Sequence, residues 1–375
     1  MASEKAGGTI LVIGGGIGGL TSAIALRQRG FAVDVIEKDP DWTVYGVGII
    51  QQANVVRAMS QLGILDDYLE AGCPFDHVEV YLPNGMRVAR IPTPRLAEGY
   101  PANVGIGRPA LHRVLGDRTK SAGANVRLGL TADALEDDGA GVTARFSDGS
   151  ESRYDLVIGA DGLYSATRAM LFPDAPRPRF AGQGVWRYNF DRSDGLDSLC
   201  VYEGPTGVGL VPLSPSLMYM YVTTPEAGNP RYPTKGLAQA MREKLRGVPA
   251  PQIQTLATQI VDDDAVVYKP LETLFLTGDW HKGRIVLIGD AVHATTPHLG
   301  QGAGMAIEDS LVLADELERA SDIETALGAF RARRFERCRY IVEESLSICE
   351  AQVAGRTIDQ AAATRNMFEV IARPI

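Results

Sequence analysis

Apolar residues near the start of the chain form two short runs, separated by a glycine-rich segment and a helical pattern. Residues 9–13 are uncharged and rich in β-branched side chains, which predicts a buried strand. Residues 14–19 are mostly glycine, and residues 20–27 then repeat apolar side chains at helical spacing until Gly30 ends the helix. Residues 33–37 form the second apolar run. The chain is therefore expected to open with a strand, a turn, a helix and a strand.

Two later segments also combine an apolar strand with a polar turn. Residues 156–160 lead into an Asp-Gly pair at 161–162, and residues 285–288 lead into a Gly-Asp pair at 289–290. Each segment predicts a strand whose carboxyl end carries an acidic residue.

The middle of the chain has a different pattern. Short apolar or alternating runs recur between residues 179 and 269, with proline and glycine between them, and predict an antiparallel sheet. Residues 77–91 surround an Asn-Gly turn and predict a hairpin of the same sheet. Residues 322–350 predict a long helix near the C-terminus.

The first glycine motif has the spacing of a dinucleotide-binding turn. Gly14 allows a tight turn, Gly16 lets the backbone approach a pyrophosphate, and Gly19 lets the helix pack closely on the strand. The helix N-terminus then presents free N–H groups to the phosphates. Glu37, at the end of the second strand, can accept hydrogen bonds from ribose hydroxyls. This motif alone does not separate NAD from FAD.

The composition narrows the class of protein. The chain has 375 residues, a net charge of −9 and 45% hydrophobic residues, which is typical of a globular protein and argues against nucleic-acid binding. Its four cysteines lack CxxC or metal-site spacing, which favours free thiols in a reducing, cytoplasmic setting. Residues 1–8 do not have the pattern of a secretion signal, and glycines interrupt the uncharged residues 9–26, so no membrane partner is expected.

Residues 331–339 contain five arginines, with Glu336 among them and Glu343 and Glu344 close behind. Mixed charge at this density predicts a solvated helix face.

The later motifs indicate a family. Residues 161–168 read D-G-x-x-S-x-x-R, and the Gly-Asp pair at 289–290 is followed by a glycine-rich run at 300–304. Together with the first glycine motif, the order of these segments resembles the FAD-dependent aromatic hydroxylases, the group A flavoprotein monooxygenases typified by p-hydroxybenzoate and salicylate hydroxylases. Arg108, at the start of a helical pattern, is a fourth match. The resemblance extends from Gly14 to Asp309.

The resemblance implies FAD as the cofactor. Arg108 would contact its phosphates, Asp290 its ribityl hydroxyls, and the helix after residue 304 would direct its positive end at the reduced, anionic flavin. The residues expected to bind the cofactor are Gly14, Gly16, Gly19, Glu37, Lys38, Gly48, Arg108, Asp161, Asp290, Pro297, Gly300, Gly302, Ala303 and Gly304.

The implied fold is α/β, or α+β overall. A Rossmann-like FAD-binding domain, formed by residues 1–72, 97–178 and 268–375, would be interrupted by an antiparallel-sheet substrate domain, formed by residues 73–96 and 179–267. The long C-terminal helix belongs to the first domain.

The sheet domain should supply the substrate pocket. Its expected substrate contacts are Trp186, Tyr188, Tyr202 and Tyr221, and its expected catalytic residues are Arg187 and Tyr219. Neighbours on a strand point to opposite faces, so Arg187 and Tyr188 cannot both face the flavin, whereas Tyr219 and Tyr221 can. Core packing remains an alternative for each aromatic residue. Arg187 could bind a substrate carboxylate or phenolate, or it could pair with a structural acid.

His298 is a further catalytic candidate, because an imidazole titrates near neutrality and could carry the proton of a substrate hydroxyl. His293 and His298, with Asp290, also suggest a metal site. We expect none, because flavin handles oxygen without a metal.

The function implied by the resemblance is hydroxylation of a phenolic or hydroxylated heteroaromatic small molecule with NAD(P)H and O2, through a C4a-hydroperoxyflavin. No second dinucleotide fingerprint is present, so NADH and NADPH both remain open. So does the choice between a monomer and a homodimer. The alternatives are epoxidation or Baeyer–Villiger oxygenation of a non-aromatic natural product, and a flavin-binding protein without turnover.

Overall fold

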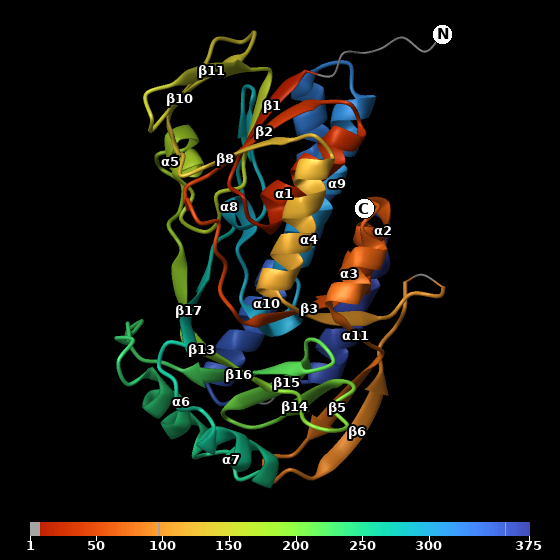
Figure 1. Cartoon of the computed structure of the whole chain (residues 1–375), viewed down its shortest axis with the longest axis vertical. Helices are drawn as coiled ribbons and strands as arrows, with labels where there is room; N and C mark the ends of the chain where they lie inside the picture. Colours follow the sequence, from red (N-terminus) through yellow and green to blue (C-terminus); the bar gives the residue numbers. More distant parts are fainter. Residues whose placement is uncertain (1–7, 97, 357) are drawn as a thin grey trace.

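The computed structural model describes residues 8–96, 98–356 and 358–375. Residues 1–7 and residue 97, where two segments of the expected FAD-binding domain begin, lie outside the described residues, as does residue 357. The described residues form an elongated molecule whose two parts are stacked along its long axis (Figure 1).

The first part is built on a six-stranded sheet of order β18–β19–β12–β1–β2–β8. Its strands are β1 (Thr9–Ile13), β2 (Ala32–Glu37), β8 (Asn125–Leu128), β12 (Leu156–Gly159), β18 (His281–Lys282) and β19 (Ile285–Leu287). All neighbours are parallel except β18 and β19. Since parallel strands end at one edge of a sheet, the turns that follow β1, β12 and β19 meet there.

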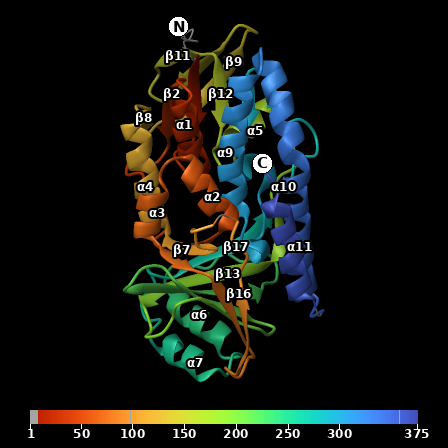
Figure 2. The same cartoon turned by 90° about the vertical axis from the view of Figure 1, so that its right-hand side faces the viewer.

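Helices cover this sheet. They include α1 (Ile17–Gln28), α4 (Arg108–Ser121), α5 (Ala166–Leu171), α9 (Gly302–Arg319) and α10 (Ile323–Val353). Helix α1 contacts both α4 and α9, and α10 lies outside α9 and runs on to the second part (Figure 2). The Asp322 side chain accepts a hydrogen bond from the Thr325 N–H, at 2.8 Å, and so caps α10. The expected long C-terminal helix is therefore confirmed. The shorter helices α2 (Ala53–Gln61), α3 (Leu65–Ala71) and α11 (Gln360–Ala372), and a small sheet of β9 (Ala132–Asp137), β10 (Val142–Phe146) and β11 (Glu151–Tyr154), complete this part.

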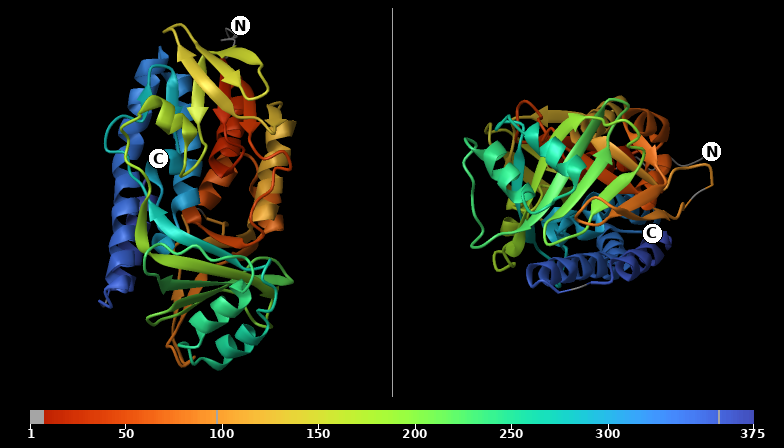
Figure 3. Two further views of the ribbon diagram at one scale, coloured as in Figure 1. Left: turned by 90° about the vertical axis from the view of Figure 1, so that its left-hand side faces the viewer. Right: turned by 90° about the horizontal axis from the view of Figure 1, so that it is seen from below.

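The second part is a seven-stranded sheet of order β17–β13–β16–β15–β14–β5–β6. Its strands are β5 (His77–Tyr81), β6 (Arg87–Pro92), β13 (Arg179–Asp191), β14 (Leu199–Tyr202), β15 (Gly207–Pro212), β16 (Leu217–Pro225) and β17 (Val267–Thr273). The pairing is antiparallel as expected, except that β14 and β5 are parallel. Helices α6 (Leu237–Leu245) and α7 (Pro251–Thr258) cover the face that points away from the first part (Figure 3).

A small antiparallel sheet of β3 (Gly48–Gln52), β7 (Asn103–Gly107) and β4 (Cys73–Phe75) lies between the two parts. Strand β4 pairs with β7 there, and β17 pairs with β13 in the seven-stranded sheet. Strand β17 thus crosses the expected boundary at residue 268, and β4, expected in the substrate domain, pairs with a strand of the expected FAD-binding domain, because strand partners are chosen by tertiary packing as well as by local pattern. The mixed α/β class is confirmed, and all four cysteines are buried free thiols.

Gly19 offers a direct test of how the first turn packs. A Cβ atom on Gly19 would lie 1.9 Å from the Gly14 carbonyl oxygen, whereas a Cβ on Gly328 of α10 would meet nothing within 4 Å. We expect Gly19→Ala to lower the free energy of unfolding by at least about 2 kcal/mol, because α1 must move off β1. Gly328→Ala should raise it by about 0.5–1 kcal/mol, because alanine is the better helix former. Urea unfolding of the FAD-free protein measures both, and equal effects would contradict this packing.

Candidate functional site

The turn after β1 contains glycines that the fold requires and one glycine with open space where a side chain would point. Gly14 has φ +112°, and its added Cβ would lie 2.5 Å from the Ala160 carbonyl oxygen. Gly14 and Gly19 are therefore required by the fold. Gly16, by contrast, is exposed at the N-terminus of α1, and a Cβ there would meet nothing within 4 Å. Backbone N–H groups at a helix start with open space in front of them fit a pyrophosphate.

Glu37 ends β2 beside this turn. Its Oε2 accepts a hydrogen bond from the Gly15 N–H at 2.8 Å, and its Oε1 accepts one from the Asp39 N–H at 3.0 Å. Each carboxylate oxygen retains a lone pair, so the group can still accept hydrogen bonds from ribose hydroxyls. Lys38, the next residue, is exposed, and its side chain forms no hydrogen bond or ion pair with the described residues.

The turn after β12 uses Asp161 mainly for structure. Its Oδ2 accepts hydrogen bonds from the Thr167 N–H, at 2.9 Å, and from the Thr167 hydroxyl, and its Oδ1 accepts one from Ser165. Ser165 in turn caps α5. Gly162 has φ +79° and open space where a Cβ would point. The aspartate therefore shapes the turn, and the glycine leaves room for a ligand.

Arg168, the last residue of this motif, joins two turns. Its Nη1 donates to the Ala291 carbonyl at 2.9 Å, and its Nη2 donates to the Leu163 carbonyl at 2.8 Å. Ala291 lies in α8 (Asp290–His293), so the buried guanidinium ties the turn after β12 to the turn after β19. Sequence reasoning recorded this arginine only as part of a motif.

The turn after β19 is held by buried charges that sequence reasoning missed. His293 Nε2 lies 2.6 Å from Asp309 Oδ2, and the Gly289 N–H donates to the same oxygen at 2.9 Å. Arg334 Nε donates to Asp309 Oδ1 at 2.7 Å. Burial alone would lower the pKa of His293, but Cys338 and Asp309 raise it well above its usual value. This network fixes the backbone directly before Asp290.

The expectation of a solvated face for residues 331–339 is wrong for Arg334. Its side chain is 0% exposed and pairs with both Asp309 and Glu308. No local pattern in the sequence indicates that Arg334 is buried, because mixed charge on a helix is usually solvated. Its partner acids lie on α9, distant in the sequence.

His293, Asp309 and Cys338 also bring three possible metal ligands within 4.8 Å of one another. Arg334 already donates to Asp309 and, at 3.5 Å, to the Cys338 sulfur. The guanidinium cation opposes a metal cation at this position, so we assign no metal site to the cluster.

Four polar side chains lack protein partners at the junction of the two parts. They are Arg108 of α4, Asp290 of α8, Arg187 of β13 and Tyr219 of β16, and none forms a side-chain hydrogen bond or ion pair with the described residues. Burial lowers the pKa of Arg108, against the opposing effects of Tyr219 and Asp290. The surrounding protein partly desolvates Asp290 and raises its pKa, although the residue remains open to solvent, and His293 and Arg108 oppose that rise. These groups are close enough to influence one another's charge, so they converge on one site.

The segment after α8 leads into the N-terminus of α9. Pro297 begins the short 3-10 helix η1 (Pro297–Leu299), and Gly300 ends it with φ +67°. Gly302 and Ala303 open α9 and are partly exposed, so the positive end of an 18-residue helix is accessible. Gly304 is buried, and a Cβ there would lie 2.8 Å from Gln301 Oε1. Gly304 thus allows close packing within the protein.

Gly48 also packs against protein. A Cβ on Gly48 would lie 2.4 Å from the Tyr219 ring, whereas a Cβ on Gly46 would meet nothing within 4 Å. Asn189 Nδ2 donates to the Gly46 carbonyl at 2.5 Å. The open glycine of this segment is therefore Gly46, and Gly48 makes room for Tyr219.

Three expected substrate contacts lie on the other face of the seven-stranded sheet. Trp186, Tyr188 and Tyr202 are buried in the core between this sheet and helices α6 and α7. The Tyr202 hydroxyl donates to Gln252 Oε1 of α7 at 2.6 Å. The alternation of side chains on β13 therefore turns Trp186 and Tyr188 away and leaves Arg187 facing the first part. Of the expected contacts, Tyr221 lies on the same face as Tyr219.

His298 is held by three polar contacts. Its Nδ1 lies 3.0 Å from Thr296 Oγ1, and its Nε2 lies 3.0 Å from Gln183 Oε1 and 3.1 Å from Gln352 Oε1. Burial lowers its pKa to about 4, below the near-neutral value on which the proton-carrier hypothesis depends. The imidazole links η1 to β13 and α10.

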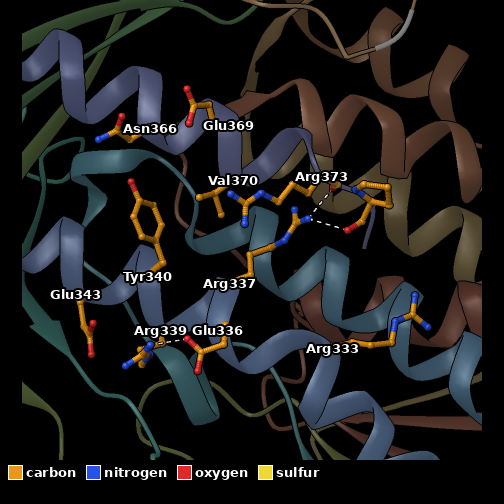
Figure 4. Close-up of a pocket in the computed structure, with 11 residues that line it drawn as sticks. Arg333, Glu336, Arg337, Arg339, Tyr340, Glu343, Asn366, Glu369, Val370 and Arg373 are labelled. Carbon is orange, nitrogen blue, oxygen red and sulfur yellow. Dashed lines mark hydrogen bonds and ion pairs between the residues drawn. The ribbon is translucent and has the colours of Figure 1, made fainter.

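The surface also has a hollow between α10 and α11 (Figure 4). It is lined mainly by charged residues: Arg333, Glu336, Arg337, Arg339, Glu343, Glu369 and Arg373. Arg337 pairs with Glu308 and donates to the Arg373 carbonyl at 2.6 Å, and Arg339 pairs with Glu336. Because Arg333, Arg337 and Arg339 already have partners within the protein, we do not assign the functional site to this hollow.

Comparisons with known proteins agree with this geometry. A sequence profile of the FAD binding domain family matches residues 8–324. The putative FAD-dependent monooxygenase YetM of Bacillus subtilis is 30% identical over 349 residues, which cover 92% of this chain and 94% of that protein. Aurachin C monooxygenase/isomerase of Stigmatella aurantiaca is 33% identical over 361 residues, which cover 92% of this chain and 89% of that protein.

Among solved structures, that of Klebsiella pneumoniae HpxO complexed with FAD and uric acid matches with a TM-score of 0.84 and 28% identity, and covers 97% of this chain and 92% of that chain. The chain therefore belongs to the FAD binding domain family, within the group A FAD-dependent aromatic hydroxylases. Its cofactor is FAD, and its relatives are FAD-dependent monooxygenases. Among the described residues, no helix has both the length and the apolar character needed to cross a membrane.

Gly16 provides a test of the cofactor site. A valine there fits the FAD-free fold, because the position is open and its backbone is extended, but it would fill the space of the pyrophosphate. We expect Gly16→Val to leave the melting temperature of the FAD-free protein unchanged and to weaken FAD binding by about 100-fold or more, on the order of 3 kcal/mol. Gly247→Val, at an open position after α6, is the control. Fluorescence titration that found equal FAD affinity in both variants would argue against this site.

His298 predicts a pH-dependent contribution to stability. Its folded-state pKa lies below the ordinary value, so protons favour the unfolded state as the pH falls from about 6.5 towards 4. In FAD-free protein, wild type should lose about 2–3 kcal/mol more unfolding free energy than His298→Gln between pH 7 and pH 4.5. Denaturant unfolding at both pH values measures the difference. Parallel losses in the two proteins would show that this imidazole is not buried in its neutral form.

Proposed function

We propose that this protein is an NAD(P)H-dependent FAD monooxygenase that hydroxylates a phenolic or hydroxylated heteroaromatic small molecule. In this proposal the part with the six-stranded sheet binds FAD, and the seven-stranded sheet supplies the substrate pocket. The observation that carries it is the convergence of Arg108 and Asp290, from the first part, with Arg187 and Tyr219, from the second, without protein partners among the described residues.

The walls of the proposed pocket around Tyr219 are apolar, as oxygen chemistry requires. Tyr219 packs in a buried cluster with Phe75, Val211 and Leu213. Such walls exclude water and strengthen the few polar interactions within them. Bound FAD supplies the acceptance of hydride and the activation of oxygen. The protein excludes water from the site, orients the substrate and supplies the positive end of α9.

Tyr219 is suited to hold a substrate hydroxyl. Burial raises its pKa, while Arg187 and Arg108 oppose the rise, so the phenol stays protonated at neutral pH. Its O–H can donate to a substrate oxygen and stabilise negative charge that develops there. In this role Tyr219 donates a hydrogen bond and does not remove the proton of the substrate hydroxyl. We do not assign that proton removal to His298.

The relatives support an aromatic substrate. One is named for aurachin C, and one solved structure contains uric acid. Uric acid is a nitrogen heterocycle, so a hydroxylated heteroaromatic ring fits the family as well as a phenol does. The choice between NADH and NADPH is left to experiment.

Anaerobic reduction tests the proposal. We would mix the FAD-loaded protein with NADH or NADPH without oxygen, follow loss of oxidised-flavin absorbance, and repeat with phenols, hydroxybenzoates, hydroxypyridines, hydroxyquinolines and hydroxypurines. At least one compound should accelerate bleaching by about 10-fold or more. The proposal expects NAD(P)H to reduce the flavin rapidly only when substrate is bound, which avoids wasting NAD(P)H. Equal rates across the panel would favour oxygenation of a non-aromatic compound. Absence of reduction by either nucleotide would favour a flavin-binding protein without turnover.

A further inference from the structure

A pair of buried amide side chains joins the start of α2 to the start of α9. Asn54, in the first turn of α2, is 0% exposed, and Gln301, the residue before α9, is 1% exposed. Asn54 Nδ2 donates to Gln301 Oε1 at 2.9 Å, and Gln301 Nε2 donates to Asn54 Oδ1 at 3.2 Å. Two amides that bond each other in both directions hold both backbones, because moving either one leaves buried polar groups unsatisfied.

The backbone of α9 leaves room for this amide pair. A Cβ atom on Gly304 would lie 2.8 Å from Gln301 Oε1 and 3.2 Å from Asn54 Nδ2. A larger residue at this position would have to displace the amides or the helix. The first turn of α9 is therefore packed directly against the pair.

Buried charges set the direction of the two amides. Glu308, in the second turn of α9, accepts a hydrogen bond from Asn54 Nδ2 at 3.1 Å. The same carboxylate pairs with Arg334 at 2.7 Å and with Arg337 at 3.1 Å. A carboxylate held by two guanidinium groups only accepts hydrogen bonds, so it must face the NH2 group of Asn54. The amide oxygen of Asn54 is then left to accept from Gln301.

Gln52 extends this network to the backbone of the glycine-rich turn. Gln301 Nε2 also donates to Gln52 Oε1, and Gln52 Nε2 donates to the Leu299 carbonyl at 3.3 Å. Leu299 and Gln301 flank Gly300, which has φ +67°. Because glycine offers little resistance to backbone rotation, the turn depends on the side chains that hold it on both sides.

The network leaves the N-terminus of α9 free. The Gln301 side chain does not cap α9, and Gly302 and Ala303, which open the helix, are partly exposed. Their N–H groups and the positive end of the helix can therefore act on a ligand. The effect of a helix end falls off within one turn, so it depends on the position of the first turn.

This dependence distinguishes the two redox states of the cofactor. Oxidised flavin is neutral, and transfer of a hydride adds one negative charge to it. A displaced first turn would therefore weaken the binding of reduced FAD more than that of oxidised FAD. The ratio of these two affinities determines how far the protein shifts the reduction potential of the cofactor.

We propose that Asn54 and Gln52 are positioning residues, which hold the first turn of α9 through Gln301 and Leu299 and thereby raise the reduction potential of bound FAD. This inference rests on the proposed function, because it takes the first part as the FAD site, with the reduced flavin next to α9. A higher potential makes hydride transfer to the flavin more favourable.

Separate titrations with the two redox states of FAD test the proposal. FAD-free protein is titrated by calorimetry under anaerobic conditions, once with oxidised FAD and once with FAD reduced by dithionite. Gln52→Met keeps the length of the side chain and removes its amide. It should weaken the binding of reduced FAD about 10-fold more than that of oxidised FAD, which lowers the potential of the two-electron couple by about 30 mV.

Gln28→Met is the matched control. Gln28 Nε2 donates to the Leu62 carbonyl at 2.9 Å. This variant therefore also removes a hydrogen bond from a glutamine amide to a leucine carbonyl, but at the opposite end of α2. Its ratio of the two affinities should match that of wild type.

Asn54→Leu removes the centre of the network. The ratio should change in the same direction and further, by about 100-fold, or about 60 mV. If this variant does not fold, the comparison of Gln52→Met with Gln28→Met decides the question.

A purely structural role gives a different result. It would lower the melting temperature of the FAD-free protein and weaken the binding of both redox states by the same factor. The proposal is overturned if Gln52→Met keeps the wild-type ratio, or if Gln28→Met changes the ratio as much as Gln52→Met does.

The outcome is independent of the anaerobic reduction experiment, because the titrations contain neither NAD(P)H nor substrate. An unchanged ratio with intact substrate-gated reduction would remove the positioning role and leave the hydroxylase. A shifted ratio without gated reduction by any aromatic compound would do the reverse.

Discussion

The carboxyl edge of the parallel sheet depends on one buried carboxylate, that of Asp309. It accepts hydrogen bonds from the Gly289 N–H and from Arg334, and it pairs with His293, all without exposure to water. Breaking a buried ion pair by removing one partner costs about 3–5 kcal/mol, so this arrangement has little freedom to relax. It fixes the backbone that presents Asp290 to the site. Helices α9 and α10, which carry Asp309 and Arg334, are therefore part of the cofactor site although they contribute few groups to its surface.

With that backbone fixed, the two parts of the protein present different kinds of surface to the site. In the first part, most buried polar groups are hydrogen-bonded within the protein, and what remains open to a ligand is backbone at Gly16, Gly162 and the start of α9, together with the side chains of Arg108 and Asp290. Such surfaces suit phosphates and a flavin. In the second part, the face towards the site is largely apolar, and its polar groups include Arg187, Asn189, Tyr219 and Tyr221. A surface of that kind suits a flat ring with few polar contacts. The site exists only where the two parts meet.

Sequence was most informative where a local rule decided the structure. The turn at Gly14 and the close packing at Gly19 follow from backbone sterics, and the order of the motifs indicated the family and the α/β fold. Alternation on β13 was predictable, but the sequence did not show which face points to the site. That depends on α6 and α7, which cover the face that carries Trp186 and Tyr188. The parallel pairing of β14 with β5 and the burial of Arg334 depend on partners distant in sequence, which local patterns do not reveal.

The central claim is that the edge formed by β1, β12 and β19 binds FAD and no other dinucleotide in its place. Calorimetric titration of FAD-free protein with FAD, and separately with NAD, tests it most directly. We predict one FAD per chain with an affinity in the micromolar range or tighter, about −8 kcal/mol or more favourable, and no saturable NAD binding in that range. Tight binding of NAD without binding of FAD, or binding of neither, would contradict the account.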